Sequence, residues 1–351
     1  MSSNTSSPET VGVIGAGSFG SALANLLAEN QQVLLYARRP AVAKALQHNR
    51  SYKGRNIADP VRLTNDLQEL AKECELIFPI VPSENFRGMI RSLAPYLNPS
   101  HKLIHGTKGF DIQLPEGESL DSFDGLNRDH VKTMSEVIRE ETVVLRVGCV
   151  AGPNLAGEIA DGQPAATVVG SRFDEVIRSG QLALRSSRFR VHGNHELLGI
   201  ELAGVLKNIM AVAAGVLAGM ELGDNTRAML ITRGLAEMVY IGKGLGANVK
   251  PFLGLAGIGD LVATCSSPHS RNFNLGYRLG KGESLTQIRE TMEETAEGVK
   301  TIQIVRALSS RLKISAPISL ALHRILFEGM EIEKGMRLLM EFPFREDVEF
   351  I

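Results

Sequence analysis

A single lysine lies inside one of the most apolar segments of the chain. Lys207 falls within Glu201-Leu-Ala-Gly-Val-Leu-Lys-Asn-Ile-Met-Ala-Val-Ala-Ala-Gly215, where nearly every neighbour is small or apolar. A helix that is apolar on all faces is buried, and burial disfavours an ammonium and lowers its pKa toward neutrality. Lys207 is therefore a candidate proton donor and acceptor. The alternative is a lysine whose head reaches the surface, but its neighbours leave little polar face for that.

An aspartate and a polar triplet follow further along the chain. Asp260 comes after Gly254-Leu-Ala-Gly-Ile-Gly259 and leads into an apolar stretch, so its carboxylate needs a partner, for which a lysine is the natural choice. Ser270-Arg271-Asn272 stands at an expected helix start and could hold an anion, with Arg271 supplying a guanidinium and Asn272 a further donor. For the triplet alone, a simple helix cap is equally consistent.

A glycine motif near the N-terminus predicts a dinucleotide site. Gly15-Ala-Gly-Ser-Phe-Gly20 follows an expected strand and opens an expected helix. In such a turn Gly15 permits the tight bend, Gly17 lets the backbone approach a pyrophosphate, and Gly20 lets helix and strand pack closely. The helix N-terminus then presents free N–H groups to the phosphates. A glycine-rich turn without a ligand is the alternative.

The residues after the second strand indicate which dinucleotide binds. A site for NAD places an acidic residue there to bind the ribose 2′-hydroxyl, whereas this chain reads Tyr36-Ala-Arg-Arg39. Two guanidiniums suit a 2′-phosphate. We therefore expect NADP(H) to be preferred, with NAD(H) possible, although Arg38 and Arg39 could also be ordinary surface cations.

The elements that must position these residues fall into two groups. Before residue 197, short β-branched runs alternate with helical stretches, which predicts an α/β doubly wound, parallel sheet of the Rossmann type. The expected strands are Val11–Ile14, Val33–Tyr36, Val61–Thr64, Glu75–Val81, Lys102–His105, Thr142–Val150, Ala166–Val169 and Phe189–Val191. Pro79 lies inside one of them and cannot donate to a ladder, so that strand should end nearby.

After residue 197 only helical periodicity remains. The expected helices are Leu197–Gly219, Asn225–Gly244, Asn272–Lys281, Ser284–Met292, Ala296–Arg311 and Pro317–Phe327. The chain is thus expected to have a flexible tail at 1–10, a dinucleotide-binding domain at 11–197, and an all-helical substrate and catalytic domain at 198–351.

Composition narrows the possible partners. The 351 residues include 38 Lys and Arg against 39 Asp and Glu, which argues against nucleic-acid binding through bulk charge. The three cysteines are far apart, which fits a reducing cytoplasm. No export signal is seen, and Lys207 and Asn208 interrupt the apolar run Leu202–Met220, so we expect a buried core helix and no membrane span. His192 and His195 are expected at the domain junction without cysteine or carboxylate partners, and no metal is expected.

Taken together, these segments resemble the NAD(P)-dependent glycerol-3-phosphate dehydrogenases from Val11 to about Phe342. The resemblance rests on the glycine motif, the Lys207 and Asp260 segments, and five further motifs. The further motifs are Thr107-Lys-Gly109, Gly152-Pro-Asn154, Gly223-Asp-Asn-Thr-Arg-Ala228, Leu230-Ile-Thr-Arg-Gly-Leu-Ala-Glu-Met238 and Ser270-Arg-Asn272. Several motifs in this order are highly specific.

The resemblance implies a fold, an activity and roles for residues. The family joins a Rossmann domain to a helical domain like that of 6-phosphogluconate dehydrogenase, is usually a homodimer, and interconverts dihydroxyacetone phosphate and sn-glycerol 3-phosphate for phospholipid synthesis. It makes Lys207 the proton donor and acceptor. The substrate residues it implies are Lys108, Gly152, Asn154, Lys207, Asn208, Asp260, Thr264, Ser270, Arg271 and Asn272. The cofactor residues it implies are Gly15, Gly17, Ser18, Phe19, Gly20, Arg38, Arg39, Lys108, Ala156, Arg271 and Glu297.

Three positions depart from the family pattern. The family usually has Trp at position 19 and Phe at position 155, where this chain has Phe19 and Leu155. Both substitutions keep an apolar wall, so only details of cofactor packing should differ. Pro79 stands where the family usually has a small, flexible residue.

Two other functions remain open on the sequence alone. One is a dehydrogenase of the related 6-phosphogluconate or 3-hydroxyacid type, against which Arg271 and Asn272 favour a phosphorylated triose. The other is a non-catalytic NADP-binding regulator, which would need the glycine motif but no buried lysine paired with Asp260.

Overall fold

The chain forms two compact units. The computed structural model describes residues 10–52, 54–120, 123, 125–292 and 296–342. One unit comprises the chain up to Thr107 together with Met134–Leu197, and the other comprises Lys108–Thr133 and the chain from Leu198. Residues 108–133, which are expected in the dinucleotide-binding domain, group with the helical unit in this division. The expected tail at 1–10 lies outside the described residues except for Thr10.

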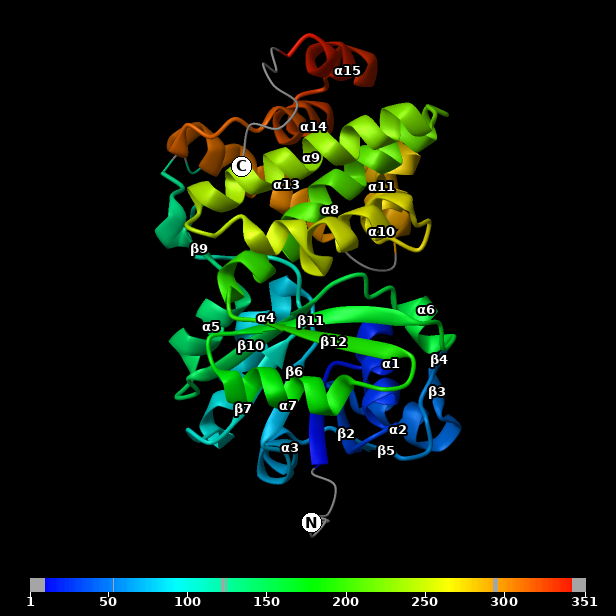
Figure 1. Cartoon of the computed structure of the whole chain (residues 1–351), viewed down its shortest axis with the longest axis vertical. Helices are drawn as coiled ribbons and strands as arrows, with labels where there is room; N and C mark the ends of the chain where they lie inside the picture. The colour runs from blue at the N-terminus through cyan, green and yellow to red at the C-terminus, as the bar shows by residue number, and fades with distance from the viewer. Residues whose placement is uncertain (1–9, 53, 121–122, 124, 293–295, 343–351) are drawn as a thin grey trace. The chain divides into compact units, whose positions relative to one another are not determined.

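The first unit is built on an eight-stranded sheet (Figure 1). Its strands are β1 Thr10–Ile14, β2 Gln32–Tyr36, β5 Val61–Thr64, β6 Leu76–Pro79, β7 Lys102–His105, β10 Arg146–Ala151, β11 Ala165–Ser171 and β12 Phe189–Asn194. Their order is β12-β11-β10-β7-β6-β1-β2-β5. From β5 to β10 this is the Rossmann order, in which ligands bind at the carboxyl ends of the strands.

Helices cover both faces of this sheet. One apolar core includes side chains of α1, α2 and α7, and a second includes side chains of α3, α4 and α5. The helices are α1 Ser18–Leu27, α2 Pro40–Asn49, α3 Leu67–Glu73, α4 Ser83–Leu93, α5 Met134–Glu141, α6 Ala156–Ala160 and α7 Asp174–Leu184, with a 3₁₀ turn at Ala94–Tyr96 and a small pair of strands, β3 Ser51–Tyr52 and β4 Arg55–Asn56. Two buried layers flank the strands, as the alternating sequence pattern predicts.

The predicted parallel, doubly wound sheet has one antiparallel pair of strands. β11 runs antiparallel to β10, and β12 then pairs parallel to β11. The connection from β10 to β11 contains only the short helix α6, which does not form the crossover that a parallel neighbour requires. The chain therefore turns back beside β10.

Pro79 is accommodated at the end of its strand. β6 pairs with β7 through Leu76 and Ile77 alone, so no ladder bond to β7 requires an N–H from Pro79. Its carbonyl still accepts a hydrogen bond from Gly106 N at 3.2 Å. The strand ends at Pro79, as predicted.

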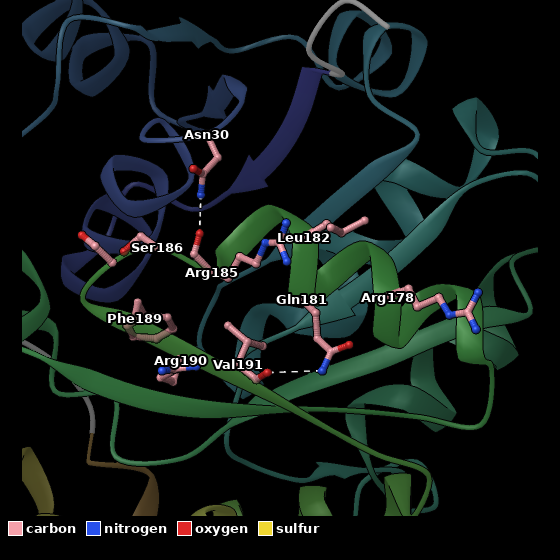
Figure 2. A pocket seen from close by; sticks show the side chains of 10 residues that line it. Asn30, Arg178, Gln181, Leu182, Arg185, Ser186, Phe189, Arg190 and Val191 are labelled. Atoms are coloured by element: carbon pink, nitrogen blue, oxygen red, sulfur yellow. Dashed lines mark hydrogen bonds between the residues drawn. The ribbon is translucent and has the colours of Figure 1, made fainter. Parts of the chain in front are cut away.

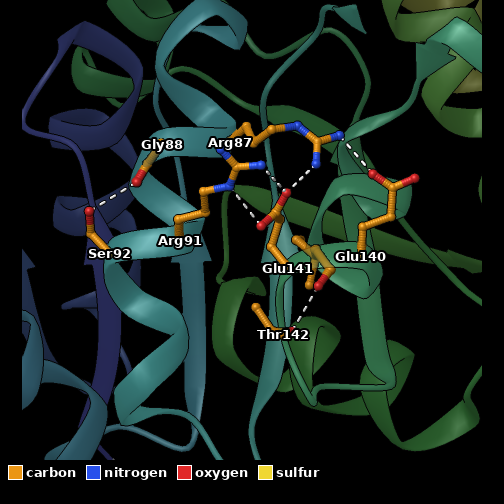
Figure 3. A network of polar contacts seen from close by, with 8 residues as sticks. Arg87, Gly88, Arg91, Ser92, Glu140, Glu141 and Thr142 are labelled. Carbon is orange, nitrogen blue, oxygen red and sulfur yellow. Dashed lines mark hydrogen bonds and ion pairs between the residues drawn. The ribbon is translucent and has the colours of Figure 1, made fainter. Parts of the chain in front are cut away.

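An ion-pair network joins α4 to α5 on one face of the sheet (Figure 3). Arg87 pairs with Glu140 at 2.7 Å and also with Glu141, while Arg91 pairs with Glu141 at 2.8 Å. The two arginines share one carboxylate, which holds the pKa of Glu141 below its usual value through hydrogen bonds against a smaller effect of burial. Networks of this kind fix two helices more firmly than isolated surface pairs do.

The second unit is helical. Its helices are α8 Leu197–Gly219, α9 Asp224–Gly244, α10 Asp260–Ser266, α11 Arg271–Gly280, α12 Leu285–Thr291, α13 Glu297–Leu312, α14 Pro317–Phe327 and α15 Ile332–Met340, with short strands β8 Asp111–Ile112 and β9 Val131–Lys132, 3₁₀ turns at Arg128–His130 and Lys250–Leu253, and a π-helical turn at Leu255–Gly259. Among the described helices, α8 alone is long and apolar enough to cross a membrane, and 89% of its most apolar window is buried inside the protein.

Close contact between α8 and α11 depends on glycine. Gly215 and Gly219 of α8 face Gly276 and Gly280 of α11 at four-residue spacing. A Cβ on Gly215 would come within 2.0 Å of Phe273 O, and one on Gly276 within 2.0 Å of Val212 O. The two backbones therefore touch directly, and this contact brings the start of α11 beside the middle of α8.

A buried glutamate caps α14 from a neighbouring helix. Ala316, at the N-cap position of α14, has no side chain that can accept a hydrogen bond. Instead, Glu237 of α9 accepts from Ile318 N at 2.7 Å and from Ser319 N at 2.9 Å, and it also accepts from the Ser319 hydroxyl. Burial raises the pKa of Glu237 to about 7, although these hydrogen bonds oppose the increase. The carboxyl thus completes the helix end.

We expect Glu237→Gln to flatten the pH dependence of stability between pH 4.5 and 7. In this window the folded chain retains a proton on Glu237 that the unfolded chain has released, so the free energy of unfolding falls as pH rises. The total effect is about 3 kcal/mol at most. Denaturant unfolding at several pH values measures it, with Glu333→Gln on the exposed face of α15 as the control. Parallel curves for wild type and Glu237→Gln would contradict the assignment.

Candidate functional site

The glycine motif forms the tight turn that the sequence predicts. Gly15 has φ +118°, a conformation that favours glycine, and a Cβ on Gly20 would come within 1.9 Å of Gly15 O. A Cβ on Gly17 would meet nothing within 4 Å. Gly15 and Gly20 are thus needed for the turn itself, while Gly17 leaves open space beside the N-terminus of α1, where a pyrophosphate could approach.

Side chains around this turn also come from the carboxyl ends of neighbouring strands. Ser18 is exposed at the first position of α1, and Phe19 packs over Gly106, where a Cβ would come within 2.9 Å of its ring. Arg38 and Arg39 are exposed between β2 and α2. The Phe19 ring therefore packs against the Gly106 backbone, and both guanidiniums are accessible to an anion.

A second group of candidate site residues follows the end of β10. Gly152 has φ +149°, and Asn154 donates from Nδ2 to Thr167 Oγ1 at 2.9 Å. Within the described part of the chain, the buried Oδ1 of Asn154 has no hydrogen-bond partner. Ala156 opens α6 just beyond. A buried acceptor without a partner is costly unless a ligand donates to it.

The buried lysine and the buried aspartate meet in the helical unit. Lys207 is 6% exposed and Asp260 is 2% exposed. Lys207 Nζ lies 2.9 Å from Asp260 Oδ1, and Lys108 Nζ lies 2.6 Å from Asp260 Oδ2. Lys207 also donates to the Thr264 hydroxyl, which donates to Asp260 Oδ1 at 3.1 Å. The expected lysine–aspartate pair is therefore present, with a second lysine added.

Burial and charge set the protonation of this cluster. Burial lowers the pKa of Lys207 to about 8, with Asp260 opposing and Lys108 adding to the decrease. Burial alone would raise the pKa of Asp260, but the two lysines hold it below its usual value. Two ammonium groups thus share one carboxylate, which leaves a net positive charge in a cluster that is largely shielded from water. Lys207 can both hold and release a proton near neutral pH.

The backbone conformation before Asp260 explains why this segment is rich in glycine. Leu255–Gly259 is a π-helical turn that leads directly into α10, a feature often found at functional sites. A Cβ on Gly257 would come within 2.0 Å of Phe252 O. The turn continues without a break into α10, so Asp260 lies inside one helical stretch, and Thr264 follows one turn later on the same face.

The three residues of the segment Ser270-Arg-Asn272 have different contacts. Ser270 caps α11 by accepting from Phe273 N, so the helix-cap alternative holds for this residue. Asn272 is buried, and its Oδ1 accepts from Gly298 N at 2.9 Å, which ties α11 to the N-terminus of α13 and to Glu297. Arg271 is exposed at the start of α11. Asn208, next to Lys207, donates to Lys108 O at 3.2 Å and so holds the Lys108 backbone in place.

Thiol and metal chemistry have no support at this site. Burial raises the pKa of Cys265, beside Thr264, to about 12, so the thiol is not a nucleophile. Among the described residues, no group of three or more His, Cys, Asp or Glu side chains could hold a metal ion. The expectation that His195 has no carboxylate partner is wrong, because its Nε2 lies 3.4 Å from Asp174 Oδ1.

Comparison with known proteins agrees with this arrangement. The N-terminal model of the NAD-dependent glycerol-3-phosphate dehydrogenases matches residues 10–176, and the C-terminal model matches 196–337. Glycerol-3-phosphate dehydrogenase [NAD(P)+] of Pseudomonas paraeruginosa is 42% identical over 98% of this chain and 97% of its own.

Solved structures agree as well. The crystal structure of glycerol-3-phosphate dehydrogenase from Coxiella burnetii has a TM-score of 0.82 and 31% identity over 95% of this chain and 99% of its own. A ketopantoate reductase from Ralstonia eutropha, with a TM-score of 0.55 and 13% identity over 93% of this chain and 99% of its own, is similar in fold alone. The chain belongs to the NAD-dependent glycerol-3-phosphate dehydrogenase family.

Proposed function

We propose that this chain catalyses the reversible reduction of dihydroxyacetone phosphate to sn-glycerol 3-phosphate with NADPH, and less efficiently with NADH. The observation that carries the proposal is the buried Lys207, held between Asp260 and Thr264, in a member of this dehydrogenase family. A ketone reduction needs a proton donor beside the carbonyl oxygen, and Lys207 has the pKa and the burial for that task.

The residues of the first unit suit a nicotinamide dinucleotide. The open face of Gly17 admits the pyrophosphate, and Arg38 and Arg39 would bind a 2′-phosphate. The bound nicotinamide supplies the hydride. The remaining residues assigned to the cofactor by family resemblance are Ser18, Phe19, Lys108, Ala156, Arg271 and Glu297.

Lys207 acts on the substrate oxygen. As negative charge grows on the carbonyl oxygen, the Lys207 ammonium stabilises it and donates a proton. Asp260 keeps that ammonium charged despite its burial, and Lys108 supplies a second positive charge. The excess of one positive charge favours an anionic transition state over the neutral ketone.

The start of α11 suits the substrate phosphate. Arg271 offers a forked donor at a helix N-terminus, where anions are favoured. Asn272 presents Nδ2, because its Oδ1 is engaged by Gly298. Gly152 and Asn154 contribute substrate contacts by family resemblance, and the unpartnered Oδ1 of Asn154 can accept from a substrate hydroxyl.

Lys207→Met should lower kcat for dihydroxyacetone phosphate reduction by about 10²–10⁴-fold, because methionine keeps the volume and removes the proton. NADPH absorbance gives the rate, and Lys243→Met on the exposed side of α9 is the control. Wild-type turnover in Lys207→Met would refute the role of Lys207.

Activity of the wild-type protein restricted to an unphosphorylated hydroxyacid would favour the hydroxyacid class of dehydrogenase. NADPH binding without turnover on any substrate would favour a regulator.

Asp260→Asn should move the basic limb of the reduction profile to lower pH. The carboxylate raises the pKa of Lys207, so its loss lets burial and Lys108 lower that pKa below about 8. The measurement is kcat for ketone reduction from pH 6 to 9. Thr264→Val is the matched variant, because it removes a neutral partner of Lys207 and leaves the limb where it is. Coincident limbs for Asp260→Asn and wild type would contradict this electrostatic role.

The double variant Arg38→Ala, Arg39→Ala should raise the KM for NADPH by about 10-fold or more and leave that for NADH within about twofold. Only NADPH carries the 2′-phosphate, and a hydrogen bond to a charged group contributes about 1.5–3 kcal/mol. Steady-state kinetics with both cofactors measure the effect, with Arg172→Ala as an exposed control in the same unit. Equal increases in both KM values would disprove the selectivity argument.

Family membership carries three further expectations. We propose that the chain forms a homodimer, works in the cytoplasm and supplies glycerol 3-phosphate for glycerophospholipid synthesis. Light scattering that finds a single 38.0 kDa chain in solution would contradict the dimer.

A further inference from the structure

The first unit contains a cavity that the proposed reaction does not use (Figure 2). It has a volume of about 800 Å³, within the range of small-molecule sites. Its walls come from α7, from the start of β12 and from Asn30, which follows the C-terminal end of α1. The glycine turn lies at the other end of α1, roughly 15 Å away along the helix. The cavity is therefore separate from the dinucleotide site.

Three arginines line this cavity without ion-pair partners. In the described part of the chain, no carboxylate pairs with Arg178, Arg185 or Arg190, and no acidic residue lines the cavity. Two nearby arginines do have carboxylate partners, since Arg146 pairs with Glu175 and Arg188 pairs with Glu29. The cavity thus collects positive charge that the protein itself leaves unbalanced.

The spacing of these arginines favours an elongated ligand. Arg178 and Leu182 lie about one turn apart on α7, Arg185 is the first residue after its C-terminal end, and Arg190 lies on the neighbouring strand (Figure 2). Arg178 is six residues before the last residue of the helix, which is about 9 Å along the helix axis. Two cationic ends therefore flank a neutral centre.

The edge of β12 is not available to a docking strand at this point. The outward carbonyl of Phe189 accepts from Ser186 N at 3.0 Å, and that of Val191 accepts from Gln181 Nε2 at 3.2 Å. A strand added to this edge would have to displace both bonds. The concave, arginine-lined shape instead favours a small molecule.

We propose that this cavity binds a small molecule carrying two or more phosphate groups. Guanidinium groups bind phosphate oxygens through paired, charge-assisted hydrogen bonds. The hydroxyls of Ser186 and Ser187 supply further donors at the Arg185 end. Leu182, which is 54% exposed, packs against the uncharged middle of the ligand.

Calorimetric titration with inorganic tripolyphosphate tests this site. The protein is first saturated with NADPH and sn-glycerol 3-phosphate, so that both the dinucleotide site and the proposed phosphate site at Arg271 are filled. Wild type should bind one tripolyphosphate, and the double variant Arg185→Ala, Arg190→Ala should bind it at least about 10-fold more weakly, because two charged donors are lost. Arg172→Ala, an exposed change outside the cavity, should bind as wild type does.

Two outcomes would overturn the proposal. One is no binding of tripolyphosphate to wild type, and the other is equal affinity for wild type and the double variant. A sulfate titration at matched ionic strength separates a polyphosphate site from general anion attraction, and equal affinity for sulfate also counts against it. The replaced side chains are exposed, and a thermal unfolding curve checks that the variant is folded. Binding is read without turnover, so the result is independent of the proposed reaction.

Discussion

The helical unit is organised around one buried carboxylate that must stay ionised. Asp260 has almost no access to water, and an unpaired charge in that position would be strongly destabilising. Lys207 and Lys108 each supply a compensating ammonium from a different segment of the chain. Removing Asp260 would leave two ammonium groups without a counter-charge, and removing both lysines would leave the buried carboxylate unpaired. This explains why a helix as apolar as α8 retains a lysine, and why residues after Thr107 join the helical unit.

The packing around the carboxylate serves the same constraint. Lys207 lies on α8, which is buried along most of its length, and α11 packs against α8 with backbone touching backbone at Gly215 and Gly276. The π-helical turn before α10 then sets the direction of the Asp260 side chain. Glycine is needed at each of these contacts for steric reasons, and none of these glycines takes part in proton transfer. The geometry of the site therefore depends partly on residues that have no side chain.

Much of this could be predicted from the sequence, and the rest depends on contacts between distant segments. The rule that a buried charge needs a partner is enough to pair Lys207 with Asp260, and the doubly wound Rossmann class follows from alternating strands and helices. The pairing of Lys108 with Asp260 spans 152 residues, and no local pattern encodes it. The reversal of β11 depends on how short α6 is, and the cap that Glu237 provides for α14 depends on packing between helices. The spacing of residues in the sequence cannot predict these three features, because each depends on how distant segments pack.

Asn272 shows how a structural bond can define a chemical role. An amide side chain offers an acceptor and donors, and a sequence cannot say which of them faces a ligand. Here Oδ1 is engaged by Gly298 N at the start of α13, so only the donor end remains for a ligand, which must be an acceptor such as a phosphate oxygen. The same bond fixes the start of α11 relative to Glu297. One hydrogen bond therefore both leaves a donor for the ligand and couples a proposed substrate residue to a proposed cofactor residue.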